Sequence, residues 1–555
     1  MPSQLTSVVS RMWSKQLLVI FFLNYLLKSQ SVEVTTSLGK ILGSTHTTRL
    51  GKTIFAFRGI RYAKAPTNEL RFKPPVPVDP WPGTYNATED GPVCPQPVLV
   101  PASEDCLFLN VYTTQLSAKR PVIIHLHAGG FYSATGRSNW GGPQYFLDQD
   151  IVLVTLNYRI GSLGFLSLGK ELPGNNGLRD QVVAMKWVKQ HIEHFGGDPN
   201  SVTLYGYSAG AWSINLHMVS PMSRGLFHKA ILGSGSAVGQ WPLPKNQIEV
   251  AKRQARALNC SDNNSQEILD CLKTKSAEEL GNSLFQMMEF GINPVLIWSP
   301  VIEEDFGQER FLPDDPFKLI KKGNFEKIPI ILGVTQDEFA NMAFPMLSNA
   351  TLLQMLSDNF EKYAPICFIY ERETPKSRQV SKGIRKFYFN DEPLTNDSFK
   401  GLADAYADLV GFQVNRAANL ISQYSTQSVY YYKFSYQGRY SHFYLPDSNG
   451  TIPYGVVHHD DLIYSFYIST LFPFFNASFP EKEMVQTLTT LWANFAKTGN
   501  PVSENKGTTA FPIWTPYDTK SRKYLDIGEK LVIKGNMFKE RYDFWSKFYP
   551  ICNCV

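Results

Sequence analysis

Gly206-Tyr207-Ser208-Ala209-Gly210 joins two runs of different character. A strand-like run, Val202 to Tyr205, leads into this pentapeptide, and a helix-like run leaves it from Ala209. In that context Gly-x-Ser-x-Gly indicates a nucleophile elbow, a strand-to-helix turn too sharp for side chains on either flank of the serine. The sequence therefore predicts an α/β fold that holds the Ser208 hydroxyl out at the N-terminus of a helix.

A serine hydroxyl is a weak nucleophile unless a base removes its proton, so the elbow predicts a histidine and a carboxylate that orients it. The apolar run Pro329 to Val334 predicts a buried strand that ends just before Glu338, the predicted acid. His458 lies in a polar segment and is the predicted base, because imidazole exchanges protons near neutral pH. The chain order Ser208, Glu338, His458 is that of α/β-hydrolases rather than of chymotrypsin or subtilisin.

A tetrahedral intermediate also needs hydrogen-bond donors for its oxyanion, and backbone N–H groups suit this role because they are already in place. Val122 to Leu126 predicts an early strand that ends in the glycine-rich segment His127 to Phe131. We assign the oxyanion hole to the N–H groups of Gly129, Gly130 and Ala209, the residue after the nucleophile.

Further motifs accompany these residues along the chain. They are Phe57 to Ala63, Glu104 to Tyr112, His127 to Phe131, Gly206 to Gly210 and Asn494 to Pro501. Together they make the chain resemble the type-B carboxylesterases and cholinesterases, from about Val34 to about Tyr549. The resemblance implies the α/β-hydrolase fold, a single domain over residues 32–550 with a large central, mostly parallel β-sheet flanked by helices. The sequence then ends in a short Cys-containing tail at 551–555.

The same resemblance implies several pairings and pocket residues. It implies structural ion pairs between Arg58 and Glu104 and between Arg159 and Asp180, and disulfides between Cys94 and Cys106 and between Cys260 and Cys271. It also places Ser234 as a hydrogen-bonding residue near the acid and Trp241 on the wall of the acyl pocket, although both could equally be ordinary core residues.

The sequence departs from the family pattern near the nucleophile. Tyr207 stands where cholinesterases usually have glutamate, and the Cys94 to Cys106 segment lacks the tryptophan that stacks on quaternary ammonium. Choline esters are therefore not the expected substrates. Ala128, Trp212 and Phe339 each replace a smaller residue of the family, which could narrow the site or slow the reaction.

The N-terminal segment predicts export. Arg11 and Lys15 precede the apolar run Leu17 to Leu27, which reads as a signal peptide over residues 1–31 with cleavage near 29–31. Eleven residues are too few for a membrane span, which needs about 20, so an uncleaved anchor is the less favoured alternative. Acceptor sequons for N-glycans begin at Asn86, Asn259, Asn263, Asn349, Asn396, Asn449 and Asn476. We therefore expect a secreted, extracellular glycoprotein without a membrane anchor.

The overall composition narrows the possible partners. The chain has 555 residues, 43% of them hydrophobic, and a net charge of +5, with no basic cluster interleaved with aromatic residues, so nucleic acid is not an expected partner. His458 to Asp461 is a run of metal-type ligands, but adjacent residues do not converge easily on one ion, and neither a metal nor another cofactor is expected. The pairing of Cys367, Cys552 and Cys554 stays open: a thiol near the C-terminus could be free, which we favour, or could join two subunits. The oligomeric state is not predicted.

These observations predict a secreted serine hydrolase that cleaves small, non-choline carboxylic esters through an acyl-enzyme. Two alternatives stay open. A cholinesterase-like binding or adhesion protein would be expected to lose the nucleophile and gain a membrane span, and a stoichiometric ester scavenger would keep the triad but release its acyl group slowly.

Overall fold

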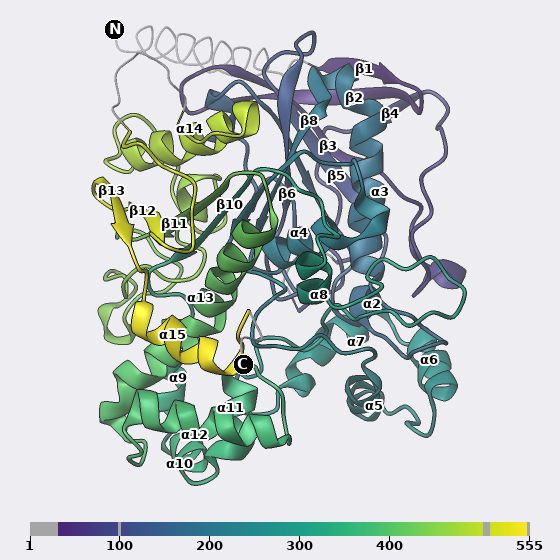
Figure 1. Ribbon diagram of the computed structural model, residues 1–555. Coiled ribbons are helices and arrows are strands. Elements are labelled where there is room, and N and C mark those ends of the chain that lie inside the picture. Colours follow the sequence, from purple (N-terminus) through teal and green to yellow (C-terminus); the bar gives the residue numbers. More distant parts are fainter. Residues whose placement is uncertain (1–30, 98–101, 503–510, 552–555) are drawn as a thin grey trace, which may run out of the picture.

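The computed structural model describes residues 31–97, 102–502 and 511–551. The expected signal peptide, apart from Ser31, and the tail cysteines Cys552 and Cys554 lie outside these residues. The strands are β1 (Val32–Thr36), β2 (Gly39–Thr47), β3 (Thr53–Arg61), β4 (Thr84–Asn86), β5 (Phe108–Thr113), β6 (Arg120–Leu126), β7 (Val152–Leu156), β8 (Gly197–Tyr207), β9 (Lys229–Gly233), β10 (Ile330–Thr335), β11 (Val429–Phe434), β12 (Lys523–Ile527) and β13 (Leu531–Gly535). They form one 13-stranded sheet in the order β1-β2-β3-β5-β7-β6-β8-β9-β10-β11-β12-β13, with β4 beside β2 (Figure 1).

The centre of this sheet is parallel and its edges are antiparallel. Neighbours from β7 to β12 pair in parallel, whereas β1, β2, β3, β5 and β7 pair antiparallel in succession, as do β12 and β13. Parallel strands are covered on both faces, which explains the unbroken apolar runs: every residue of β7 and β10 is buried. The predicted large, mostly parallel sheet is thus confirmed.

Helices cover both faces of the sheet. They are α2 (Gly161–Phe165), α3 (Asn176–His191), α4 (Ala209–Val219), α5 (Ile248–Ala257), α6 (Ser265–Thr274), α7 (Ala277–Asn282), α8 (Pro316–Lys321), α9 (Ala343–Leu347), α10 (Ala350–Asp358), α11 (Phe360–Cys367), α12 (Pro375–Phe389), α13 (Phe399–Tyr424), α14 (Lys482–Thr498) and α15 (Lys539–Phe548). Successive strand residues point to opposite faces: Val122 and Ile124 join the core cluster that contains α3, α4 and α13, and Ile123 joins the one that contains α14. Figure 1 shows the long α13 and the shorter α4 packed along the sheet.

Both implied disulfides and one of the two implied ion pairs are present. Disulfides join Cys94 to Cys106 and Cys260 to Cys271. The buried guanidinium of Arg159 donates two hydrogen bonds to Asp180, from Nε to Oδ2 at 2.8 Å and from Nη2 to Oδ1 at 2.7 Å. Cys367 is a buried thiol that is free in the described part of the chain.

The expected pair of Arg58 with Glu104 is wrong. Arg58 lies on β3 beside the segment that follows β4, where its Nη1 is 3.4 Å from Asp90 Oδ2 and its Nη2 donates to the carbonyl of Thr88. Glu104 pairs instead with Arg71, whose Nε lies 2.7 Å from Glu104 Oε2. The reason is the bridge between Arg58 and Thr88, just after β4, which places Arg58 beside Asp90 and leaves Glu104 to Arg71.

All seven sequon asparagines are exposed. Among the described residues, no helix combines the length and the apolar character that crossing a bilayer requires.

Candidate active site

Ser208 occupies the sharp turn between β8 and α4. Its backbone has φ 52° and ψ −118°, a region that non-glycine residues rarely enter and that often marks functional sites. The turn is held by the Ser208 N–H, which donates to Gly233 O on β9 at 2.8 Å, and by the Ser208 carbonyl, which accepts from Trp212 N–H at 2.9 Å. A Cβ at position 210 would lie 2.0 Å from Leu126 O at the end of β6, so only glycine fits there.

Glu338 lies three residues beyond the end of β10, at the same carboxyl edge of the sheet. Its side chain is only 2% exposed. One oxygen, Oε1, accepts the backbone N–H of Thr335 at 2.8 Å, and the other, Oε2, is 2.5 Å from His458 Nδ1. A buried carboxylate bound in this way fixes the orientation of the imidazole ring.

His458 comes from the long loop between β11 and α14. Its Nδ1 faces Glu338, while its Nε2 is buried and has no hydrogen-bond partner in the described part of the chain. The Phe339 ring packs on the imidazole with centroids 4.2 Å apart. The Ser208 hydroxyl also makes no hydrogen bond to any described residue, and such contacts often tighten only when substrate is bound.

A pair of hydrogen bonds that sequence reasoning missed ties the acid to the histidine loop. Asp337 N–H donates to Val456 O, and Val456 N–H donates to Asp337 Oδ2, both at 2.9 Å. Asp337 and Val456 each stand within two residues of a predicted catalytic group. The signal available in the sequence was a carboxylate next to Glu338 and a glycine, Gly455, three residues before the histidine.

Tyr207 connects the elbow to the histidine loop by hydrogen bonds. Its hydroxyl accepts from Ser234 Oγ at 2.8 Å and from the backbone N–H of His459 at 3.0 Å. Burial, together with the nearby carboxylates of Asp461 and Glu338, raises the pKa of Tyr207 well above its usual value. Ser234, expected near the acid, therefore reaches the histidine loop through Tyr207.

Asp461 is a second buried carboxyl beneath the site, and sequence reasoning gave it no role there. It is 1% exposed, and Tyr432 Oη donates to its Oδ2 at 3.0 Å. Burial raises the pKa of Asp461 to about 7. Tyr207 of β8, Tyr432 of β11 and Asp461 of the histidine loop thus form a group of buried polar side chains next to the predicted catalytic residues.

The predicted oxyanion donors lie in two places. Gly130 and Ala209 line the same cavity as Ser208. Gly129 is not among the residues that line it, and its carbonyl accepts the N–H groups of Tyr132 and Ser133, each at 2.9 Å. Gly129 and Gly130 have φ of 106° and 58°, so this loop requires glycine.

The cavity at Ser208 is small and mainly apolar. It has a volume of about 50 Å³ and no charged side chain of the described residues in its wall. Trp241, expected on the wall of the acyl pocket, lines it, and so do Trp212 and Phe339. Two of the three residues that replace smaller family residues therefore face the same space.

The four titratable residues from His458 to Asp461 point to separate partners. His458 meets Glu338, Asp461 accepts from Tyr432, and His459 packs on Tyr207 with ring centroids 5.0 Å apart. Asp460 accepts from Ser441 Oγ at 2.7 Å. In residues 31–97, 102–502 and 511–551 no three His, Cys, Asp or Glu side chains gather as a metal site would require.

Comparison with known proteins identifies the family of the chain. A profile of the Carboxylesterase family matches residues 30–545. Esterase FE4 of Myzus persicae is 38% identical over 88% of this chain and 87% of its own, and a juvenile hormone esterase of Tribolium castaneum is 38% identical over 84% of each chain. The crystal structure of a juvenile hormone esterase from Manduca sexta, with OTFP covalently attached, superimposes with a TM-score of 0.83 at 29% identity, over 94% of this chain and 100% of that one.

The matching profile covers nearly the whole chain, and the alignments with the two esterases cover 87% and 84% of those proteins. The chain therefore belongs to the carboxylesterase family and is an α/β-hydrolase that cleaves carboxylic esters.

Proposed function

We propose that this protein hydrolyses small carboxylic esters in two steps through an acyl-enzyme on Ser208. His458 Nε2 takes the Ser208 proton as the hydroxyl attacks the carbonyl carbon, and Glu338 stabilises the resulting imidazolium. The N–H groups of Gly129, Gly130 and Ala209 stabilise the oxyanion. The alcohol leaves with the proton from His458, and water then releases the acid by the same steps. No cofactor takes part.

One observation carries this proposal: the buried His458 has Nδ1 on Glu338 and Nε2 without a partner among the described residues, and its ring lies 5.2 Å from that of Tyr207, the residue before the strained Ser208. An unpaired buried polar atom is costly. His191 Nδ1 and His459 Nε2 are also unpaired among the described residues, but of these three histidines His458 is the one whose other ring nitrogen lies on a buried carboxylate. Nε2 is the atom that would meet the hydroxyl of the nucleophile.

The test is hydrolysis of an aryl ester by Ser208→Ala, with Ser213→Ala as the control. Ser213 is on the same helix, and its Oγ donates to Ala209 O, so both variants lose one hydroxyl near the elbow. We expect Ser208→Ala to lower kcat by about 10⁴-fold or more and Ser213→Ala to retain turnover. Wild-type turnover by Ser208→Ala would refute the assignment. A burst of one equivalent without turnover in the wild type would identify a scavenger instead.

We propose that the substrates lack a quaternary ammonium group. Tyr207, the residue before the nucleophile, is a buried, neutral phenol and so offers no negative charge to a cationic alcohol group. Such a cation would lose hydration at the site without gaining an opposite charge from this residue. An aryl acetate should therefore be hydrolysed with a higher kcat/KM than acetylthiocholine.

We also propose that the protein is secreted after loss of residues 1–31 and carries N-glycans. Two disulfides and seven exposed sequon asparagines support this. N-terminal sequencing of protein from the culture medium should find an end near residue 31. Removal of N-glycans should lower the apparent mass, and recovery of the protein only within cells would contradict secretion.

A further inference from the structure

We propose that Trp212 sets the largest acyl group that the enzyme accepts, and that its substrates are esters of short carboxylic acids. This inference rests on the hydrolysis proposed above. It specifies the acid half of the substrate and names the side chain that limits it.

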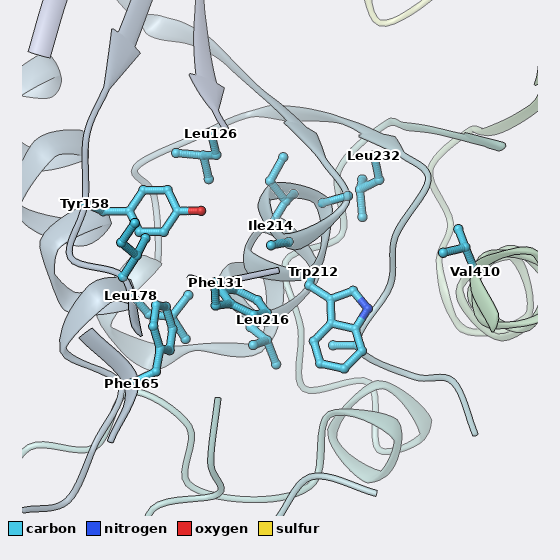
Figure 2. Packing of buried hydrophobic residues seen from close by; sticks show 14 of the residues in the cluster. Leu126, Phe131, Tyr158, Phe165, Leu178, Trp212, Ile214, Leu216, Leu232 and Val410 are labelled. Carbon is cyan, nitrogen blue, oxygen red and sulfur yellow. The ribbon is translucent and has the colours of Figure 1, made fainter. Parts of the chain in front are cut away.

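The Trp212 side chain is held in one position by a hydrogen bond. It is 7% exposed, and its indole Nε1 donates to Gln413 Oε1 on α13. Gln413 is fixed in turn, because its Oε1 also accepts Ser236 N–H at 3.0 Å and its Nε2 donates to Leu409 O at 2.6 Å. Figure 2 shows the indole reaching from its own helix toward the one that carries Val410. The ring therefore bridges α4 and α13 and cannot swing aside without breaking a buried hydrogen bond.

The remaining space is small because the indole occupies one side of it. The cavity at Ser208 measures about 50 Å³, well below the roughly 150 Å³ of a cavity that binds benzene. The Phe131 ring lies 6.0 Å from the Trp212 ring, and Val410 and Leu409 of α13 line the cavity as well. Apolar walls of this kind favour a short alkyl chain over a polar group.

The cavity lies on the acid side of the ester. When the tetrahedral intermediate collapses, His458 Nε2 must reach the departing alcohol oxygen to give it a proton. His458 does not line the cavity, whereas Gly130 and Ala209, which we assign to the oxyanion, do. Phe339 lines the cavity and packs on His458, so it separates the two. The group that enters the cavity is thus the acyl chain, which stays on Ser208 after the alcohol has gone.

Trp241 is the competing candidate for this role. It lines the same cavity and also a second one of about 160 Å³, with Gly239 and Gln240 as their common wall. The Nε1 of Trp241 is buried without a partner among the described residues, in contrast to that of Trp212. Trp241 therefore lacks the hydrogen bond that holds Trp212 across the cavity.

The experiment compares kcat/KM for p-nitrophenyl acetate, butyrate and octanoate in the wild type, Trp212→Leu, Trp212→Phe and Trp241→Leu. Trp187→Leu is the matched control, because Trp187 on α3 is buried in the same core cluster but does not line the cavity. Active sites are counted by the acyl burst, so that poorly folded protein does not distort the rates. Ethyl and octyl acetate, followed by pH-stat, vary the alcohol alone.

We expect the wild type to favour butyrate over octanoate by at least about 100-fold, since one misfitting methylene in an apolar pocket costs about 10-fold or more. Trp212→Leu should raise the octanoate-to-butyrate ratio by at least about 10-fold, with a smaller rise for Trp212→Phe, which keeps an aromatic ring. Trp187→Leu should leave the ratio unchanged.

Three results would overturn the inference: a wild type that hydrolyses octanoate as well as butyrate, Trp212 variants with the wild-type ratio, or a shift that appears only in Trp241→Leu. A greater dependence on alcohol length than on acid length would overturn the placement of the acyl chain. Failure to hydrolyse any of these esters would instead refute the proposed function itself.

Discussion

Tyr207 gives a clear example of one side chain that serves two parts of the site. It precedes the nucleophile on β8, and its hydroxyl accepts from Ser234 on one side and from the backbone of the histidine loop on the other. Its ring lies 5.2 Å from that of His458. A neutral phenol here adds no charge to the site but fixes the position of the residue that follows the base.

Replacing Tyr207 by phenylalanine should therefore lower kcat by about 10-fold while KM changes little. The buried donors on Ser234 and His459 would lose their acceptor, which costs about 1–3 kcal/mol and loosens the loop that carries His458. Tyr205→Phe is the control, because Tyr205 is two residues earlier on the same strand, faces the same core cluster and is equally buried. Steady-state kinetics and thermal unfolding of both variants make the comparison. Equal kcat in the wild type and Tyr207→Phe would show that the hydroxyl does not position the base.

The strands and turns around the site differ in how far the sequence predicts them. β6, β8 and β10 could be predicted because each contains a mainly apolar run that is buried on both faces, and each strand is followed at once by a polar residue. Their parallel pairing then places Gly130, Ser208 and Glu338 at one edge of the sheet. The loop with His458 could be identified only by its chemistry, since nothing in its own composition predicts its path.

Contacts between elements distant in the sequence account for what could not be predicted. The bonds between Asp337 and Val456 join segments 119 residues apart. Arg58 pairs with Asp90 instead of Glu104 because the bridge between Arg58 and Thr88, which no local sequence pattern predicts, determines which residues lie beside Arg58. The cavity size depends on Gln413, 201 residues from the indole that it holds. Residue types predict which groups can react, and long-range packing determines how much room they have.

The stability of the whole molecule should depend on pH through Asp461. Burial raises the pKa of this carboxyl to about 7, whereas in the unfolded chain it would be near 3.9. Between these values the folded protein binds the extra proton, so the free energy of unfolding falls as pH rises, by up to about 1.4 kcal/mol per pH unit. Above about pH 7 the loss is complete and constant. Tyr432, Tyr207 and Glu338 face the same carboxyl and contribute to its pKa.

Asp461→Asn removes this proton but keeps an acceptor for Tyr432. The variant should gain stability relative to the wild type as pH rises from 5 to 7, and the difference should level off above that. Thermal midpoints of both proteins between pH 5 and 8 provide the measurement. Curves that run parallel over this range would show that Asp461 is not the group responsible.

The assigned groups are spread widely along the chain, since Gly129 and His458 are 329 residues apart (458 − 129). Neither half of the polypeptide, expressed alone, would contain the complete set of catalytic residues. A cleavage of the chain that lets the two halves separate would therefore abolish activity before the protein is degraded. Turnover of a chromogenic ester is consequently a sensitive gauge of intact native protein. It can report refolding yield, shelf life or damage during purification without a separate structural assay.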